Sequence, residues 1–130
     1  MKMYVFGNSE IREDSIALRI VPQLKKRFPE VQFILHSSID EIEPSHTICI
    51  LDSAIGINEV LLITNIKQLK QSKSSTQHDF DISFQLQFLQ KIGKIKKVNI
   101  IAIPTNFDEE KAVKKASEII KLIRPKGRRM

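Results

Sequence analysis

The chain has 130 residues, which is enough for one domain of ordinary size, whereas two independent domains would each lack an adequate core. Hydrophobic residues make up 42% and charged residues 28% of the sequence, a composition that excludes a mainly disordered chain. The net charge is +6, but much of it lies in the terminal segment RPKGRRM. The remaining basic residues barely exceed the acidic ones, and this balance is too weak to imply a phosphate-tracking surface on the folded body.

The cysteine content and the hydropathy bear on the cellular compartment in which we expect the protein. A single cysteine, Cys49, cannot form an internal disulfide, and the sequence shows neither a signal peptide nor an apolar run long enough to span a bilayer. We therefore expect a cytoplasmic monomer that binds neither membranes nor nucleic acid. We interpret residues 1–123 as one α/β domain and residues 124–130 as a basic C-terminal tail.

The first half of the chain alternates between strand-like and helix-like segments. Residues 2–6 form a β-prone run that stops at the turn signal Gly7-Asn8. Apolar residues then recur at helical spacing from Ser15 to about Pro29, with Asp14 or Ser15 as the N-cap. Three further strands are predicted at residues 31–35, 47–51 (TICIL) and 59–64; TICIL is continuously apolar, as in a strand buried on both faces.

The second half continues the alternation. Residues 70–77 are polar and predict a loop, after which Ile82, Leu86 and Leu89 form the buried face of a helix that stops at Gly93. Residues 97–103 predict the last strand, and helical spacing from Asp108 to Ile123 predicts a final helix with an acidic first turn. This order is typical of a three-layer α/β fold with a mostly parallel sheet and helices on both faces.

Three polar residues stand where ligands bind in such folds, beyond the carboxyl ends of the strands. Asp14 follows the first strand across a loop, Asp52 directly ends the third strand, and His78 precedes a helix. Two carboxylates and an imidazole suit a divalent first-row metal. Each residue also has an ordinary explanation: Asp14 as a helix cap, Asp52 as a structural carboxylate beside TICIL, and His78 as a solvated histidine.

Other candidate groups are weaker. His36 ends the second strand and could join the same edge, whereas His46 precedes the third strand and should lie at the opposite edge. Ser74 and Ser75 lie near His78, but no nucleophile-elbow motif orients them. Cys49 lies inside TICIL and is interpreted as an inert core thiol. The chain also lacks the glycine-rich phosphate-binding motifs, which argues against a nucleotide binder.

The order and setting of these residues resemble the hydrogenase maturation endopeptidases. The segment YVFGNSEIREDSIALRIVPQL, with its acidic pair Glu13-Asp14, is similar to the opening of that family. The segment ICILDSAIG resembles the family's second site, where an aspartate ends a strand. His78, before DISFQLQFLQKIGKI and KVNIIAIP, matches the family histidine in order and surroundings. The resemblance extends over nearly the whole chain.

This resemblance implies a function. Asp14, Asp52 and His78 would be the catalytic and metal-sensing residues of an aspartic-type peptidase. The substrate would be the nickel-loaded precursor of a nickel-iron hydrogenase large subunit, from which the enzyme removes a C-terminal extension. Nickel would be recognised in the precursor, without necessarily being held by the free enzyme. The alternative is a non-catalytic descendant of the family that binds the precursor or the metal without cleavage.

Overall fold

A computed structural model describes residues 1–7, 15–35, 42–43, 45–64 and 96–125 of the chain. In this part of the chain the elements are, in order, β1 (Lys2–Val5), α1 (Ile16–Arg27), β2 (Gln32–Ile34), β3 (Thr47–Ala54), β4 (Leu61–Ile63), β5 (Lys97–Pro104) and α4 (Glu109–Ile123). The helix predicted around Ile82 and the loop predicted at residues 70–77 lie outside the described residues. None of the described helices is long and apolar enough to cross a membrane.

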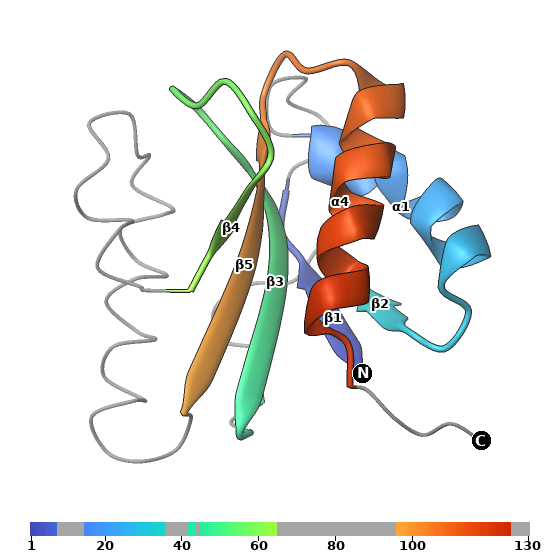
Figure 1. The fold of residues 1–130 in the computed structure, drawn as a ribbon, viewed down its shortest axis with the longest axis vertical. Coiled ribbons are helices and arrows are strands. Elements are labelled where there is room, and N and C mark those ends of the chain that lie inside the picture. Colours follow the sequence, from blue (N-terminus) through green and yellow to red (C-terminus); the bar gives the residue numbers. More distant parts are fainter. Residues whose placement is uncertain (8–14, 36–41, 44, 65–95, 126–130) are drawn as a thin grey trace.

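The described strands form one sheet in the order β2-β1-β3-β5-β4 (Figure 1). The pairs β1–β2, β1–β3 and β3–β5 are parallel, whereas β4 pairs with β5 in the antiparallel direction. β3 and β5 lie at the centre and share an unbroken register from Thr47↔Lys97 to Ala54↔Pro104. The predicted fold class, α/β with a mostly parallel sheet, is therefore confirmed.

Both described helices pack on the same face of the sheet, where they lie beside each other in Figure 1. Their buried positions follow the predicted helical spacing, with Ile20 and Leu24 in α1 and Val113 and Ile120 in α4. Together with sheet residues such as Leu51 they form the larger core cluster. In a helix, apolar residues at every third or fourth position lie on one face. Packing that face on the sheet removes it from water, and this burial stabilises the two amphipathic helices.

The opposite face of the sheet is also buried. Its cluster combines alternate strand residues with Ile42, which precedes β3 in the chain; the members are Tyr4, Phe6, Ile42, Ile48, Ile50, Val98 and Ile100. β3 and β5 are consequently buried on both faces, as the continuous apolar run TICIL predicts.

The two helices begin differently. Asp108 is the N-cap of α4, and its carboxylate accepts a hydrogen bond of 2.9 Å from the backbone N–H of Lys111. Ser15 occupies the N-cap position of α1 but makes no side-chain cap hydrogen bond. α1 also contains Pro22 in its interior, which removes one backbone donor from the helix.

Candidate functional site

Asp52 is the predicted site residue that the structure describes. The sequence predicted a strand ending at Leu51, with Asp52 directly after it; this boundary is wrong, because β3 continues to Ala54. The strand is longer because β5 runs to Pro104 and supplies register partners for the extra residues, including Ala102 opposite Asp52. Asp52 therefore lies within the central strand β3, near its carboxyl end.

The Asp52 carboxylate is held in a buried position. The residue is 5% exposed, and its Oδ1 accepts a hydrogen bond of 2.8 Å from the backbone N–H of Ser53. Side chains alternate along a strand, so Asp52 shares the face of Ile48 and Ile50, away from α1 and α4. Burying a carboxylate costs free energy unless the group is hydrogen-bonded, and the Ser53 N–H supplies one such bond to Asp52.

The carboxyl end of β1 lies beside β3 near Asp52. The backbone N–H of Phe6 donates to the carbonyl of Leu51 over 2.9 Å, which continues the parallel pairing past the last strand residue, Val5. Gly7 follows with φ 151°, a backbone conformation that favours glycine. The predicted strand therefore brings the chain, up to Gly7, to the carboxyl edge of the sheet, next to β3.

A polar network at the same edge joins the starts of the two helices. Arg19 donates from Nε to Ser15 Oγ over 2.9 Å and from Nη1 to the carboxylate of Glu109. Arg19 and Glu109 also line a cavity of about 370 Å³ that includes the loop between β5 and α4. Ser15 is buried at 4% exposure, so this network fixes the residue that directly follows Asp14 in the sequence. Sequence reasoning missed it, because Arg19 and Glu109 are 90 positions apart.

Most of the other predicted site residues lie outside the described part of the chain. These are Asp14, His36, Ser74, Ser75 and His78. The described residues alone contain no cluster of three or more His, Cys, Asp or Glu side chains that could hold a metal ion. The ligand set Asp14, Asp52 and His78 therefore stays a prediction.

Two predictions about single residues can be compared with the structure. His46 lies at the amino end of β3, opposite to the edge of Asp52, as expected; its carbonyl accepts hydrogen bonds from the backbone N–H groups of Lys96 and Lys97. Cys49 is a buried free thiol. Burial raises the pKa of the Cys49 thiol, and the nearby amide of Asn99 opposes this shift only in part, which agrees with an unreactive core cysteine.

The fold has counterparts among solved structures. The chain superposes on the hydrogenase maturating endopeptidase HybD from E. coli with a TM-score of 0.64 and 14% sequence identity, over 94% of this chain and 93% of that chain. The solution structure of an endopeptidase from Escherichia coli gives a TM-score of 0.62 at 14% identity, with the same coverage of both chains. An uncharacterized protein from Wolinella succinogenes gives 0.60 at 12% identity, over 95% of this chain and 98% of that chain.

These similarities define the class of fold. No protein-family model matches the sequence, and no curated protein matches it either. The likeness is therefore structural, and at 12–14% identity it shows a common fold over nearly the full length of each chain. The resemblance to the hydrogenase maturation endopeptidases that the sequence suggested is confirmed as a resemblance of fold.

Proposed function

We propose that the protein is a maturation endopeptidase that removes the C-terminal extension of a nickel-loaded nickel-iron hydrogenase large-subunit precursor. The observation that carries the proposal is the fold shared with HybD over 94% of the chain. A buried carboxylate, Asp52, near the carboxyl end of central strand β3 adds to it. In parallel α/β sheets this edge is where ligands bind.

The proposed chemistry gives the three predicted residues a common role. Asp14, Asp52 and His78 would contact the nickel of the bound precursor, whose charge polarises the scissile carbonyl or activates a water molecule. Asp52 is suited to this task because its carboxylate is oriented by the Ser53 backbone N–H and shielded from bulk water. A water molecule held by the carboxylates would attack the peptide carbonyl, so the mechanism requires no covalent nucleophile.

The network around Arg19 would support the same site. Its hydrogen bond to Ser15 and its ion pair with Glu109 hold the start of α1 against the start of α4 at the proposed catalytic edge. Because Ser15 directly follows Asp14, this anchoring restricts the position of the backbone from which Asp14 extends. Arg19 is thus a positioning residue in this proposal.

The decisive experiment measures cleavage. The protein is incubated with a nickel-loaded large-subunit precursor and with the same precursor lacking nickel, and the precursor mass is followed. We expect a mass loss at the precursor C-terminus only with nickel, and no loss with Asp52→Asn. Asp108→Asn is the matched control, because Asn is an equally good N-cap and α4 should be unaffected.

The rival hypothesis has a distinct outcome in the same experiment. A non-catalytic descendant would bind the nickel-loaded precursor stably and leave its mass unchanged. If the protein neither binds nor cleaves the precursor, both forms of the proposal are contradicted. The cytoplasmic location and the monomeric state belong to the proposal and are checked by cell fractionation and by size-exclusion chromatography.

A further inference from the structure

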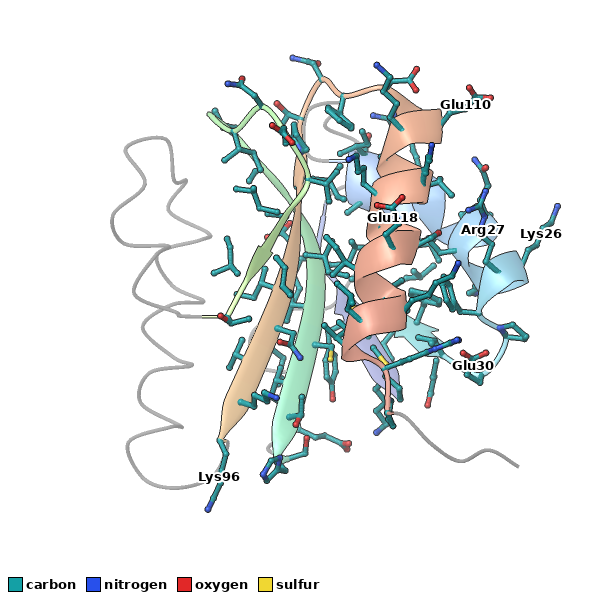
Figure 2. All side chains as sticks on the ribbon, in the orientation of Figure 1. Lys26, Arg27, Glu30, Lys96, Glu110 and Glu118 are labelled. Carbon is teal, nitrogen blue, oxygen red and sulfur yellow. The ribbon has the colours of Figure 1, made fainter. Side chains whose placement is uncertain are left out.

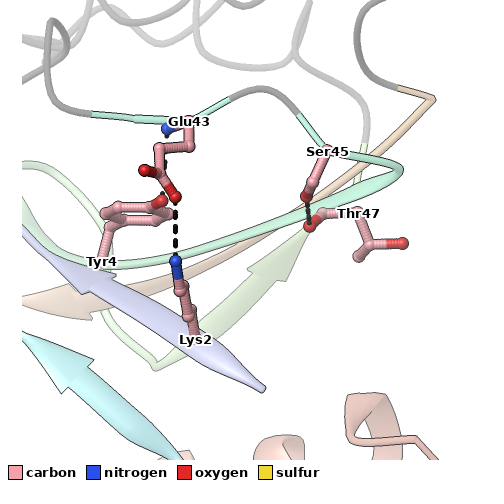
Figure 3. A network of polar contacts seen from close by, with 5 residues as sticks. All are labelled: Lys2, Tyr4, Glu43, Ser45 and Thr47. Atoms are coloured by element: carbon pink, nitrogen blue, oxygen red, sulfur yellow. Dashed lines mark hydrogen bonds and ion pairs between the residues drawn. The ribbon is translucent and has the colours of Figure 1, made fainter.

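A second cavity lies at the opposite end of the sheet from Asp52. It has a volume of about 490 Å³ and is bordered by the amino ends of β1, β3 and β5, by the segment before β3, and by the end of α4. Figure 3 shows the part of its rim contributed by β1 and the segment before β3. The volume is within the range of small-molecule sites in proteins.

The floor of this cavity is polar within an otherwise apolar pair of strands. The register pairs Thr47 with Lys97 and Cys49 with Asn99, so these four side chains lie on one face of β3 and β5. Asn99 is only 5% exposed, and its Nδ2 approaches Cys49 Sγ at 4.0 Å. Sulfur is a weak acceptor, so a ligand oxygen would be a much stronger partner for this amide donor.

The charge balance of the cavity favours an anion. Its acidic residue, Glu43, is already paired with Lys2 at 2.9 Å, and the hydrogen bond and charge of that pair raise the Lys2 pKa and lower the Glu43 pKa (Figure 3). The Glu43 backbone N–H also donates to the Tyr4 hydroxyl over 3.2 Å. Lys97 enters no ion pair within the described part of the chain, so its ammonium remains an available cation on the cavity wall.

The cavity also has apolar lining residues. Ile123, at the end of α4, and Pro125 both line the cavity. A ligand that fills this volume therefore meets an ammonium and an amide as well as hydrocarbon. We propose that this cavity is a binding site for a small carboxylate with a short apolar tail, with the carboxylate between Lys97 and Asn99.

The test is a titration of the full chain with hexanoate, followed by NMR. The expected result is saturable movement of the Asn99 side-chain amide signals and of the backbone signals of Thr47 and Cys49. Lys97→Gln should weaken binding about tenfold, the equivalent of one lost charge-assisted contact of about 1.4 kcal/mol. Lys96→Gln is the matched control and should bind as wild type, because Lys96 does not line the cavity and points away from the sheet in Figure 2.

Two further probes separate the parts of the ligand. Hexanol carries the tail without the charge, and inorganic phosphate carries charge without the tail; both should bind more weakly than hexanoate. The proposal is overturned if hexanoate produces no saturable change at Asn99, if Lys97→Gln binds as tightly as wild type, or if phosphate or hexanol binds as well as hexanoate. Because the cavity lies away from Asp52, none of these outcomes depends on peptidase activity.

Discussion

Replacing Asp52 by Asn separates a metal role from a structural role. The two side chains are nearly isosteric, so the change removes the charge and keeps an oxygen that can accept from the Ser53 backbone N–H. A hydrogen bond to a charged group contributes about 1.5–3 kcal/mol and a neutral one about 0.5–1.5 kcal/mol. The structure therefore predicts that Asp52→Asn lowers the free energy of unfolding by about 1–2 kcal/mol, because the bond weakens without being lost.

The effect of nickel should be larger than this structural loss. A ligand at 100 times its Kd stabilises the native state by about 2.7 kcal/mol, and a nickel-binding wild type should show a corresponding rise in Tm. Asp52→Asn should melt a few degrees lower without nickel and should gain nothing when nickel is added. The assay is thermal unfolding with and without nickel.

The control fixes how the result is interpreted. Asp108→Asn makes the same chemical change at a carboxylate that caps α4, so its melting temperature and its response to nickel should match wild type. If Asp52→Asn keeps the full nickel-dependent rise in Tm, Asp52 does not bind the metal. The peptidase proposal then loses the one residue of its ligand set that the structure describes. If wild type itself shows no rise, the free protein does not hold nickel, and the measurement must be repeated with the nickel-loaded precursor as the ligand.

Three other predictions concern stability. Arg19→Met should lower the free energy of unfolding by about 1–2 kcal/mol, and Glu109→Gln by less, since the bond from Arg19 to Ser15 remains; equal losses in urea unfolding would contradict this. Deleting residues 126–130 should change stability by no more than about 0.5 kcal/mol, and a large drop in Tm would mean that the domain ends later. The raised pKa of Cys49 means that the folded state keeps the thiol proton where the unfolded state loses it. Stability should therefore fall more in wild type than in Cys49→Ala as pH rises above the usual thiol range, about 8.5, and parallel pH curves would argue against a buried thiol.

The sequence predicted the elements of this fold well where the apolar pattern was long. The runs at residues 47–51 and 97–103 identified the two central strands, and the spacing from Asp108 to Ile123 identified α4. Strand ends were less certain, because pairing decides them: β3 passes Asp52 only because β5 offers a partner that far. The antiparallel direction of β4 was likewise not visible, since three residues carry no directional signal.

The candidate site was predictable in part. Asp52 could be found because a carboxylate beside a continuous apolar strand is unusual in sequence. The contact between Arg19 and Glu109 could not, because the acidic first turn of α4 already had a sufficient explanation in the helix dipole. The amino-edge cavity was missed for a related reason: Asn99 lies in β5, Cys49 in β3 and Pro125 after α4, and only the folding of the chain brings them to one place.

The strand order also determines how the molecule can assemble during synthesis. β1, α1 and β2 are close in sequence, but the inner strand β1 meets β3 only after an excursion past residue 45, and β3 meets β5 only after residue 96. The larger core is completed by Ala112, Ala116 and Ile120 of α4, the last of the described elements in chain order. Such distant pairings require loop closure before they give any stabilisation, which makes folding slow and leaves apolar strands exposed meanwhile. A nascent chain that stops before α4 would therefore present the face of β5 that α4 covers to chaperones and to other copies of itself.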